Sequence, residues 1–343
     1  MSTPASAWPQ ELYRHWYAVA RAAGIGRQPQ AITLLDRHFA IARDGAGGWL
    51  ALEDRCPHRQ VALSAGCVRD GALQCPYHGW RFDAGGRLCA LPGHDPQRPL
   101  PAFQVPSFPL REHDGLLWLR PSAEGVPTLP ALALARDPGQ RRLLWQAQWR
   151  GHVVDVMENV LDALHTHYVH AGWLRRDSRR RPVTVRLTVP AAGQACADYR
   201  GADSQSGLVW RLFESRRSGE RAHFHLPAST CLEYTYANGA AVWVGLHFSP
   251  LDARTTRVVA SLHVHRRWAP RWAVRLLLGP LLAHVGRQDA AILAAQQDNL
   301  DRFGDGRRPL RVQGDVMRPL LEDWWLHGRA PDPARARELT LWL

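Results

Sequence analysis

The chain has 343 residues, of which 45% are hydrophobic and 22% are charged, a balance typical of a soluble globular protein with room for two domains. The formal net charge is +12 and every basic residue is an arginine, but no nucleic-acid-binding motif accompanies this charge, so we expect no nucleic-acid partner. The N-terminus lacks the pattern of a signal peptide, and the apolar stretch at 273–285 is too short to span a bilayer, which predicts a cytoplasmic protein without a membrane span.

The first 120 residues predict a small domain built of short strands. The segment "HFAIARDGAGGWLALED" alternates apolar and polar residues around a glycine-rich turn, and Gly and Pro recur at short intervals after it. Such punctuation is typical of an all-β domain. We therefore expect a β domain over 1–120, including an N-terminal extension, and a linker over 121–145.

Two short loops of this domain carry potential metal ligands. Cys56 and His58 lie in "CPHRQ", and Cys75 and His78 lie in "CPYHGW". A single tetrahedral zinc site is one interpretation. Because each loop offers one Cys and one His, a two-iron cluster fits the pattern better: one iron takes both thiolates and the other takes both imidazoles.

The full motif is C-x-H, sixteen residues, then C-x-x-H-G-W, and it resembles that of the Rieske iron–sulfur family. The resemblance implies a [2Fe-2S] cluster bound by the two Cys and two His residues. Respiratory members carry two further cysteines that form a disulfide, but Val61 and Tyr77 occupy those positions here. The oxygenase or ferredoxin branch is therefore the better match, and we interpret Cys67 and Cys89 as structural.

Residues 146–343 predict a second, mixed domain. The run "VVDVMENVLDALHTHYVH" at 153–170 has helical spacing and contains no Gly or Pro. Strand-like runs such as "RPVTVRLTV" and "AAVWVGLHFSP" follow, and the segment from Gly279 returns to helix. The sequence thus predicts an α+β protein in which strands outnumber helices.

A second motif, N-x-x-D-x-x-H-x4-H, occurs within "ENVLDALHTHYVH". It resembles the mononuclear-iron segment of Rieske non-haem iron oxygenases, and "QDAAILAAQQ" at Gln288–Gln297 resembles the D-x6-Q form of their vanillate-demethylase-like branch. The resemblance covers nearly the whole chain. It implies a Rieske domain followed by a helix-grip catalytic domain over 146–343, an antiparallel sheet with helices.

The resemblance further implies that His165, His170 and Asp289 bind a mononuclear Fe(II). Two imidazoles and one carboxylate on one face of the iron leave positions open for O2 and substrate. A spacing of five residues turns the two His about 140° apart on a regular helix, so we expect the helix to distort or end between them. The alternative ligands are His167 for an imidazole, and Asp298 or Asp301 for the carboxylate.

Asp162 lies one turn before His165. The resemblance implies that it bridges the partner subunit's His78 and His165, so that an electron crosses between subunits. A bridge of this kind implies a ring of subunits, and a head-to-tail homotrimer is the family's usual ring. Asn159 is expected to support this network or to lie near the iron.

The resemblance implies a terminal oxygenase that activates O2 to hydroxylate or to O- or N-dealkylate an aromatic or polycyclic small molecule. No G-x-G-x-x-G helix opening is present, so NAD(P)H is expected to act only indirectly, through a separate reductase or ferredoxin. A cis-dihydroxylating dioxygenase is the alternative reaction. A Rieske electron carrier without oxygenase activity and a zinc-binding structural protein are alternatives from other classes.

The substrate is the least determined part of this prediction. The strand-like runs in the second half are expected to line its cavity. The candidate contacts are His225, Asn238, Trp243 and His247.

Overall fold

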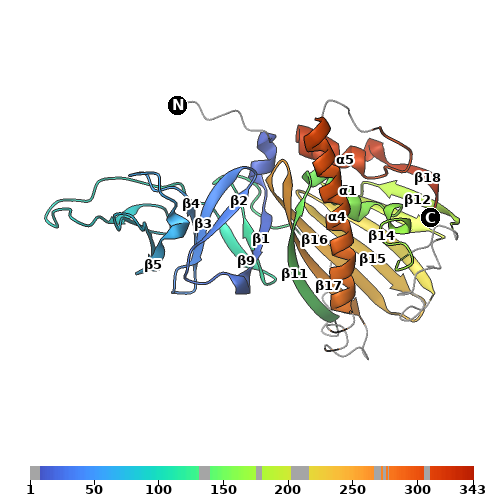
Figure 1. Ribbon diagram of the computed structural model, residues 1–343, viewed down its shortest axis with the longest axis horizontal. Coiled ribbons are helices and arrows are strands. Elements are labelled where there is room, and N and C mark those ends of the chain that lie inside the picture. Colours follow the sequence, from blue (N-terminus) through green and yellow to red (C-terminus); the bar gives the residue numbers. More distant parts are fainter. Residues whose placement is uncertain are drawn as a thin grey trace. The chain divides into compact units, whose positions relative to one another are not determined.

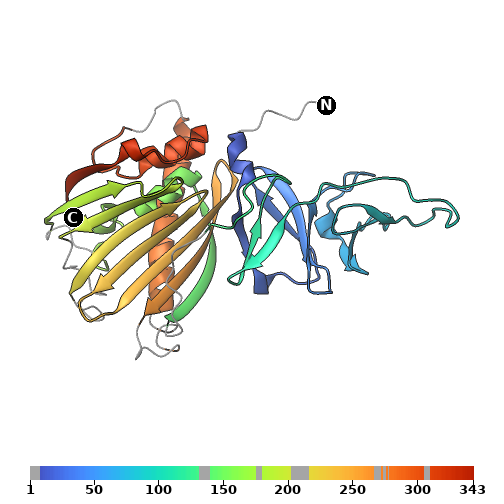
Figure 2. The same ribbon diagram turned by 180° about the vertical axis from the view of Figure 1, so that it is seen from behind.

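The computed structural model describes residues 8–130, 140–174, 180–201, 216–265, 278–304 and 310–343, together with Trp272 and Leu276. The chain forms two compact units, Gln10–Leu129 and Pro130–Leu343, and the second also includes Met1–Pro9. Figures 1 and 2 show the strands and helices of each unit from opposite sides. Strands dominate both units and helices occur mainly in the second, which confirms the predicted α+β class.

Three small antiparallel sheets make up the first unit. Their strands are β1 (Tyr17–Arg21), β10 (Leu116–Leu119) and β9 (Leu110–His113) in one sheet; β2 (Gln30–Leu34), β3 (Arg37–Arg43) and β4 (Trp49–Glu53) in the next; and β5 (Cys67–Arg69), β6 (Ala72–Gln74), β7 (Arg81–Phe82) and β8 (Leu88–Ala90) in the last. The predicted β character of this region is confirmed.

The core of this unit extends to the two loops with the potential ligands. Leu50 and Leu52 of β4 and Phe82 of β7 are fully buried, and they belong to one apolar cluster with Cys56 and Cys75. Because core side chains are closely packed, this cluster fixes the start of both loops.

The second unit is built on one antiparallel sheet of eight strands. Their order across the sheet is β11 (Gln140–Arg150), β17 (Thr255–His265), β16 (Ala241–Asp252), β15 (Ser229–Tyr236), β14 (Arg217–His225), β13 (Gln194–Arg200), β12 (Pro182–Thr188) and β18 (Arg337–Trp342). The edge strand β18 comes from the end of the chain, so the sheet joins distant parts of the sequence.

One face of this sheet carries the helices, as Figure 1 shows for α4 (Gly279–Phe303). Val244 and Leu262, which are cross-strand neighbours, pack with Leu282 of α4. Side chains alternate between the faces of a strand. The neighbouring pair Trp243 and His263 therefore lies on the face opposite to α4.

The helix expected over 153–170 is shorter in the structure. Helix α1 spans Val153–Leu161 and buries its apolar side, and a separate 3-10 turn spans His165–His167. Asp162 ends α1, because its carboxylate oxygens accept hydrogen bonds from the N–H groups of Leu164 and His165, at 2.7 and 2.9 Å. This local side-chain capping competes with continuation of the helix.

The last helix, α5 (Arg318–His327), packs against α1. The indole N–H of Trp325 donates to the sulfur of Met157 at 3.3 Å, and the ring of Trp8 stacks on His152 with centroids 5.7 Å apart. Within the described ranges, none of the helices combines the length and apolar character needed to cross a membrane.

Candidate metal sites

The two loops of the first unit share one backbone pattern. The N–H of Cys56 donates to the carbonyl of Val61 at 2.9 Å, and the N–H of Cys75 donates to the carbonyl of Trp80 at 2.8 Å. Each loop thus closes over the five residues that follow its cysteine. The repeated pattern presents the side chains of both loops in the same way.

A left-handed residue turns each loop at the fourth position after its cysteine. Gln60 has φ +64° and Gly79 has φ +70°, and their N–H groups donate back to the cysteine carbonyls at 2.9 and 3.2 Å. At Gly79 a Cβ atom would also lie 3.1 Å from Pro92. The glycine of the "HGW" sequence is therefore favoured both by its backbone angle and by this close approach.

The loops bring their potential ligands together. Cys56 and Cys75 are each 2% exposed and belong to the same buried cluster. Burial raises the pKa of the Cys56 thiol. The rings of His58 and His78 lie beside each other with centroids 4.5 Å apart.

His58 has the environment of a metal ligand rather than of a surface imidazole. Its ring stacks on Trp80, with centroids 4.7 Å apart and planes 3° apart, and its Nδ1 is buried with no hydrogen-bond partner among the described residues. Burial and the neighbouring His78 lower the pKa of His58. Neutral imidazole with an unpaired buried nitrogen, next to a pair of thiols, fits a cluster with two thiolate and two imidazole ligands.

Val61 and Tyr77, at the positions compared above with the disulfide cysteines of respiratory Rieske proteins, have other contacts here. Val61 supplies a carbonyl to its loop, and Tyr77 is 63% exposed with its ring 3.9 Å from that of His78. Cys67 and Cys89 are exposed on β5 and β8 and are not disulfide-bonded.

In the second unit, His165, His170 and Asp289 converge on one point. One potential ligand atom from each lies within 4.8 Å of the others. The Oδ1 atom of Asp289 is 3.0 Å from Nε2 of His170 and 3.5 Å from Nε2 of His165. The side chain of His170 is only 1% exposed and that of Asp289 is 10% exposed.

Helix α4 brings Asp289 to this point. Its buried residues are Asp289, Leu293 and Gln297, which recur every fourth position and define one side of the helix. A carboxylate buried on such a side costs free energy unless a cation or several donors pair with it. Its place beside two imidazoles is therefore a specific feature of the site.

Hydrogen bonds to Nδ1 fix both imidazoles in the same tautomer. Nδ1 of His165 lies 2.7 Å from the backbone oxygen of Asp162, and Nδ1 of His170 lies 2.9 Å from Oε1 of Gln288. Both oxygens accept, so Nδ1 carries the proton and Nε2 of each ring faces Asp289. The Oδ1 atom of Asp289 is buried and accepts no hydrogen bond from the described residues. Three converging acceptor atoms fit a bound cation.

The sequence did not single out Gln288. Its position directly before Asp289 was the available signal, but the contact with His170 joins residues 118 positions apart.

Burial and the charges within this group shift the pKa values of His165 and Asp289 in opposite directions. Burial lowers the pKa of His165, but the negative charges of Asp162 and Asp289 outweigh it and raise the pKa to about 9. A cation bound between these residues would therefore displace a proton from Nε2 of His165. Burial raises the pKa of Asp289, and its contacts with His165 and His170 lower it further than burial raises it. The carboxylate of Asp289 is therefore ionised at neutral pH.

The alternative ligands lie elsewhere. His167 is buried with Nδ1 facing the carbonyl of Leu164 at 3.3 Å. Asp298 and Asp301 pair with Arg150 at 2.5 and 3.0 Å. None of the three belongs to the group that His165 forms.

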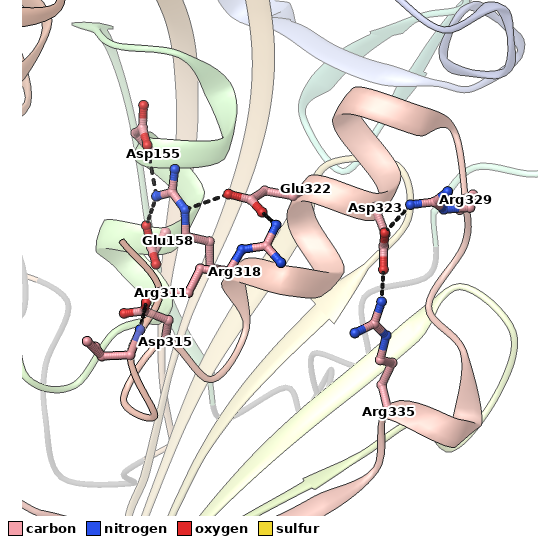
Figure 3. Close-up of polar contacts among 10 residues, drawn as sticks. Asp155, Glu158, Arg311, Asp315, Arg318, Glu322, Asp323, Arg329 and Arg335 are labelled. Atoms are coloured by element: carbon pink, nitrogen blue, oxygen red, sulfur yellow. Dashed lines mark hydrogen bonds and ion pairs between the residues drawn. The ribbon is translucent and has the colours of Figure 1, made fainter. Parts of the chain in front are cut away.

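A cavity of about 280 Å³ adjoins this group. His165, Asp162 and Asn159 line it, and Oδ1 of Asn159 is buried without a hydrogen-bond partner among the described residues. Other acidic residues in its lining are Asp155, Glu158 and Asp315. Two of these carboxylates, those of Asp155 and Glu158, pair with Arg318 of α5, which also contacts Glu322 (Figure 3).

The residues expected in the substrate cavity lie away from α4. His225 and His247 are both cross-strand neighbours of Ser229, and together with Trp243 they occupy the sheet face opposite to α4. Asn238 is exposed in the turn between β15 and β16, where its side chain accepts from the N–H of Ala240 at 3.1 Å. A role for these residues in substrate binding stays a prediction.

Two family models match the chain. A Rieske [2Fe-2S] domain matches residues 15–109, and a vanillate O-demethylase oxygenase C-terminal domain matches residues 149–318. Both loops of the first unit lie in the first match, and His165, His170 and Asp289 lie in the second.

Individual relatives are similar to parts of the chain. The oxygenase component of dicamba O-demethylase from Stenotrophomonas maltophilia is 33% identical over 48% of this chain and 49% of its own length. Methylxanthine N1-demethylase NdmA from Pseudomonas putida is 32% identical over 51% of this chain and 52% of its own length. The chain thus spans about half the length of the curated relatives it matches.

The fold is similar over a larger range. The similarity to the crystal structure of dicamba monooxygenase bound to dicamba covers 91% of this chain and 95% of the dicamba monooxygenase chain. The TM-score is 0.74 and the sequence identity is 22%. Taken together, the two domain matches, their order and this shared fold show that the chain belongs to the Rieske oxygenase family, with a catalytic domain of the vanillate O-demethylase type.

Proposed function

We propose that this protein is a terminal oxygenase that hydroxylates or O- or N-dealkylates an aromatic or polycyclic small molecule. The observation that carries the proposal is the convergence of His165, His170 and Asp289, whose acceptor atoms lie within 4.8 Å of one another and whose buried carboxylate oxygen accepts no hydrogen bond from the described residues. Two imidazoles and one carboxylate are the ligand set of oxygen-activating ferrous sites.

The ligand sets divide the cofactors between the two units. Cys56, His58, Cys75 and His78 would hold a [2Fe-2S] cluster, and His165, His170 and Asp289 would hold Fe(II). When bound, the cluster supplies single electrons, and the ferrous ion supplies open coordination positions for O2 beside the substrate. The chain itself orients the imidazoles through their Nδ1 atoms and keeps the carboxylate buried and ionised.

The overall reaction consumes two electrons, two protons and one O2. One oxygen atom enters the substrate and the other leaves as water. Oxygen insertion at a methyl group bound to O or N gives an unstable hemiacetal or hemiaminal, which releases formaldehyde. The electrons originate from NAD(P)H through a separate reductase or ferredoxin, and the arginine-rich chain with net charge +12 suits an acidic partner.

We infer that electrons pass between copies of the chain in a head-to-tail homotrimer. The carboxylate of Asp162 lines the cavity beside His165 and its side chain is 27% exposed, so it is accessible to a second copy. His78 and the neighbouring Tyr77 are both exposed in their loop. The partner subunit's His78 would then hydrogen-bond to Asp162.

The test is product analysis with the purified protein, a reconstituted reductase and ferredoxin, NADH, and a panel of methoxylated and N-methylated aromatic compounds. We expect at least one compound to lose its methyl group, with one formaldehyde released per product. His165→Ala is the matched control: it should abolish turnover while the visible absorption of the cluster stays. Protein that contains zinc, no acid-labile sulfide and no visible absorption would contradict the proposal.

The same assay separates the competing reactions. A cis-diol product would identify the aromatic-ring dioxygenase. Reversible reduction of the cluster without oxidation of any compound, in protein that binds no mononuclear iron, would identify an electron carrier.

A further inference from the structure

Gln288 connects α4 to one imidazole of the candidate iron site. It precedes Asp289 on α4 and is half-buried. Its Oε1 atom lies 2.9 Å from Nδ1 of His170, whose side chain is 1% exposed. One helix thus supplies both the carboxylate of the site and a hydrogen bond to one of the two imidazoles.

The chemistry of this contact decides where the lone pair of His170 points. An amide oxygen accepts but does not donate, so Nδ1 of His170 carries the proton. In the neutral ring the lone pair then lies on Nε2, 3.0 Å from Oδ1 of Asp289. Two acceptor atoms at this distance repel each other unless a cation or a proton lies between them.

We propose that Gln288 is a positioning residue, which holds His170 with Nε2 directed at the mononuclear iron; this inference rests on the proposed function. Metal-bound His residues commonly donate their other N–H to an acceptor that fixes the ring and tunes the metal. The acceptor at Gln288 is an amide oxygen, so it adds no charge to the site. Asp289 then contributes the only full negative charge of the ligand set.

The second imidazole is supported differently. Nδ1 of His165 bonds to the backbone oxygen of Asp162 at 2.7 Å, and no side-chain substitution removes a backbone carbonyl. Gln288 is therefore the position at which the support of a ligand can be removed while all three ligands stay. A variant there tests orientation separately from ligation.

The experiment measures metal affinity independently of turnover. Protein with an intact cluster and an emptied mononuclear site is titrated with Co²⁺, and the affinity and visible absorption of the bound ion are recorded. We expect Gln288→Leu to bind Co²⁺ about 10- to 100-fold more weakly than the parent, the range found when such supporting contacts are lost. Gln288→Glu should restore tight binding and shift the Co²⁺ absorption, because a charged acceptor makes the imidazole a stronger donor.

Two controls separate the possible failures. Asn299→Leu changes an exposed amide of the same helix and should bind Co²⁺ like the parent. If the parent binds no more tightly than His170→Ala, the three residues are not the metal site and the proposed function fails. If the parent binds tightly but Gln288→Leu has the same affinity and spectrum, only the role of Gln288 is wrong. Should Gln288→Leu not fold, an unchanged affinity and spectrum in Gln288→Glu would overturn the proposal equally.

Discussion

Asp162 accepts hydrogen bonds through both its carboxylate and its backbone oxygen. Its carboxylate caps the turn after α1 through the N–H groups of Leu164 and His165, whereas its backbone oxygen accepts from the ring of His165 at 2.7 Å. The distance from its Oδ2 to Nδ1 of His165 is 3.7 Å, too long for a hydrogen bond. The carboxylate thus orders the backbone of His165 and keeps an exposed edge in the cavity.

Replacing Asp162 by Asn separates these contributions. We expect Asp162→Asn to keep both metal centres, because the backbone contact to His165 stays, and to lose about 1 kcal/mol of stability with one of its two capping bonds. Electron transfer to the iron site should be largely lost, since Asn lacks the negative charge that pairs with an imidazolium. The measurements are iron and sulfide content and the reoxidation of reduced protein by O2 with substrate. Turnover at the parental rate would remove the bridging role, and Asp301→Asn is a matched control away from the site.

The junction of α1 and α5 is held by charges as well as by apolar packing. Arg318 contacts three carboxylates, those of Asp155, Glu158 and Glu322, as Figure 3 shows, and its side chain is 13% exposed. Burial raises the pKa of Glu158 to about 7; Arg318 lowers it, but not enough to offset burial and the charges of Asp155 and Asp315. The junction therefore contains a carboxyl group that titrates near neutral pH.

This titration predicts how stability changes with pH. The pKa of Glu158 is higher in the folded protein than its ordinary value of 4.5, so its contribution to stability is greatest below pH 4.5 and is lost as pH rises through about 7. In Glu158→Gln this loss should disappear. Relative to the parent, the variant should therefore gain more in melting temperature at pH 8 than at pH 5.

Thermal unfolding of parent and variant at the two pH values checks this. An equal difference at pH 5 and pH 8 would mean that Glu158 does not titrate in this range. Arg318→Gln is the informative comparison: it leaves three half-buried carboxylates without their shared cation, and we expect it to lower the melting temperature at pH 8 strongly.

How much of the molecule was predictable depends on sequence distance. The two loops with the candidate ligands and the candidate His165 motif stand out in the sequence because their residues are close together and their chemistry is distinctive. The end of α1 at Leu161 was missed because apolar spacing continues past it, and side-chain capping by Asp162 decides it. The sheet face occupied by His247 could not be predicted, since it depends on the register of β15 and β16.

At the scale of the whole molecule, the candidate sites occupy different units. The loops with Cys56 and Cys75 lie in Gln10–Leu129, and the group around His165 lies in the larger unit. The proposed route through Asp162 connects each copy to two others. One neighbour supplies electrons to its iron site, and the other receives electrons from its cluster. Such a ring predicts complementation between defective copies.

Two inactive variants should restore activity when they assemble together. Cys75→Ser lacks the cluster but keeps the iron ligands, and His165→Ala lacks the iron site but keeps the cluster. In rings assembled at random from equal amounts, half the copies carry iron and half of those receive electrons from a neighbour with a cluster. We therefore expect about one quarter of parental activity per chain in a closed head-to-tail ring.

The measurement is turnover of the co-expressed pair, with light scattering to establish three copies per particle. Variants purified separately and mixed without subunit exchange should stay inactive, which controls for free transfer of electrons in solution. Adding Asp162→Asn to the Cys75→Ser chain should abolish the recovered activity, because that copy's Asp162 lies beside the only functional iron of the pair. If instead the cluster served the iron of its own chain, no assembly of the two variants would be active, since neither chain carries both centres.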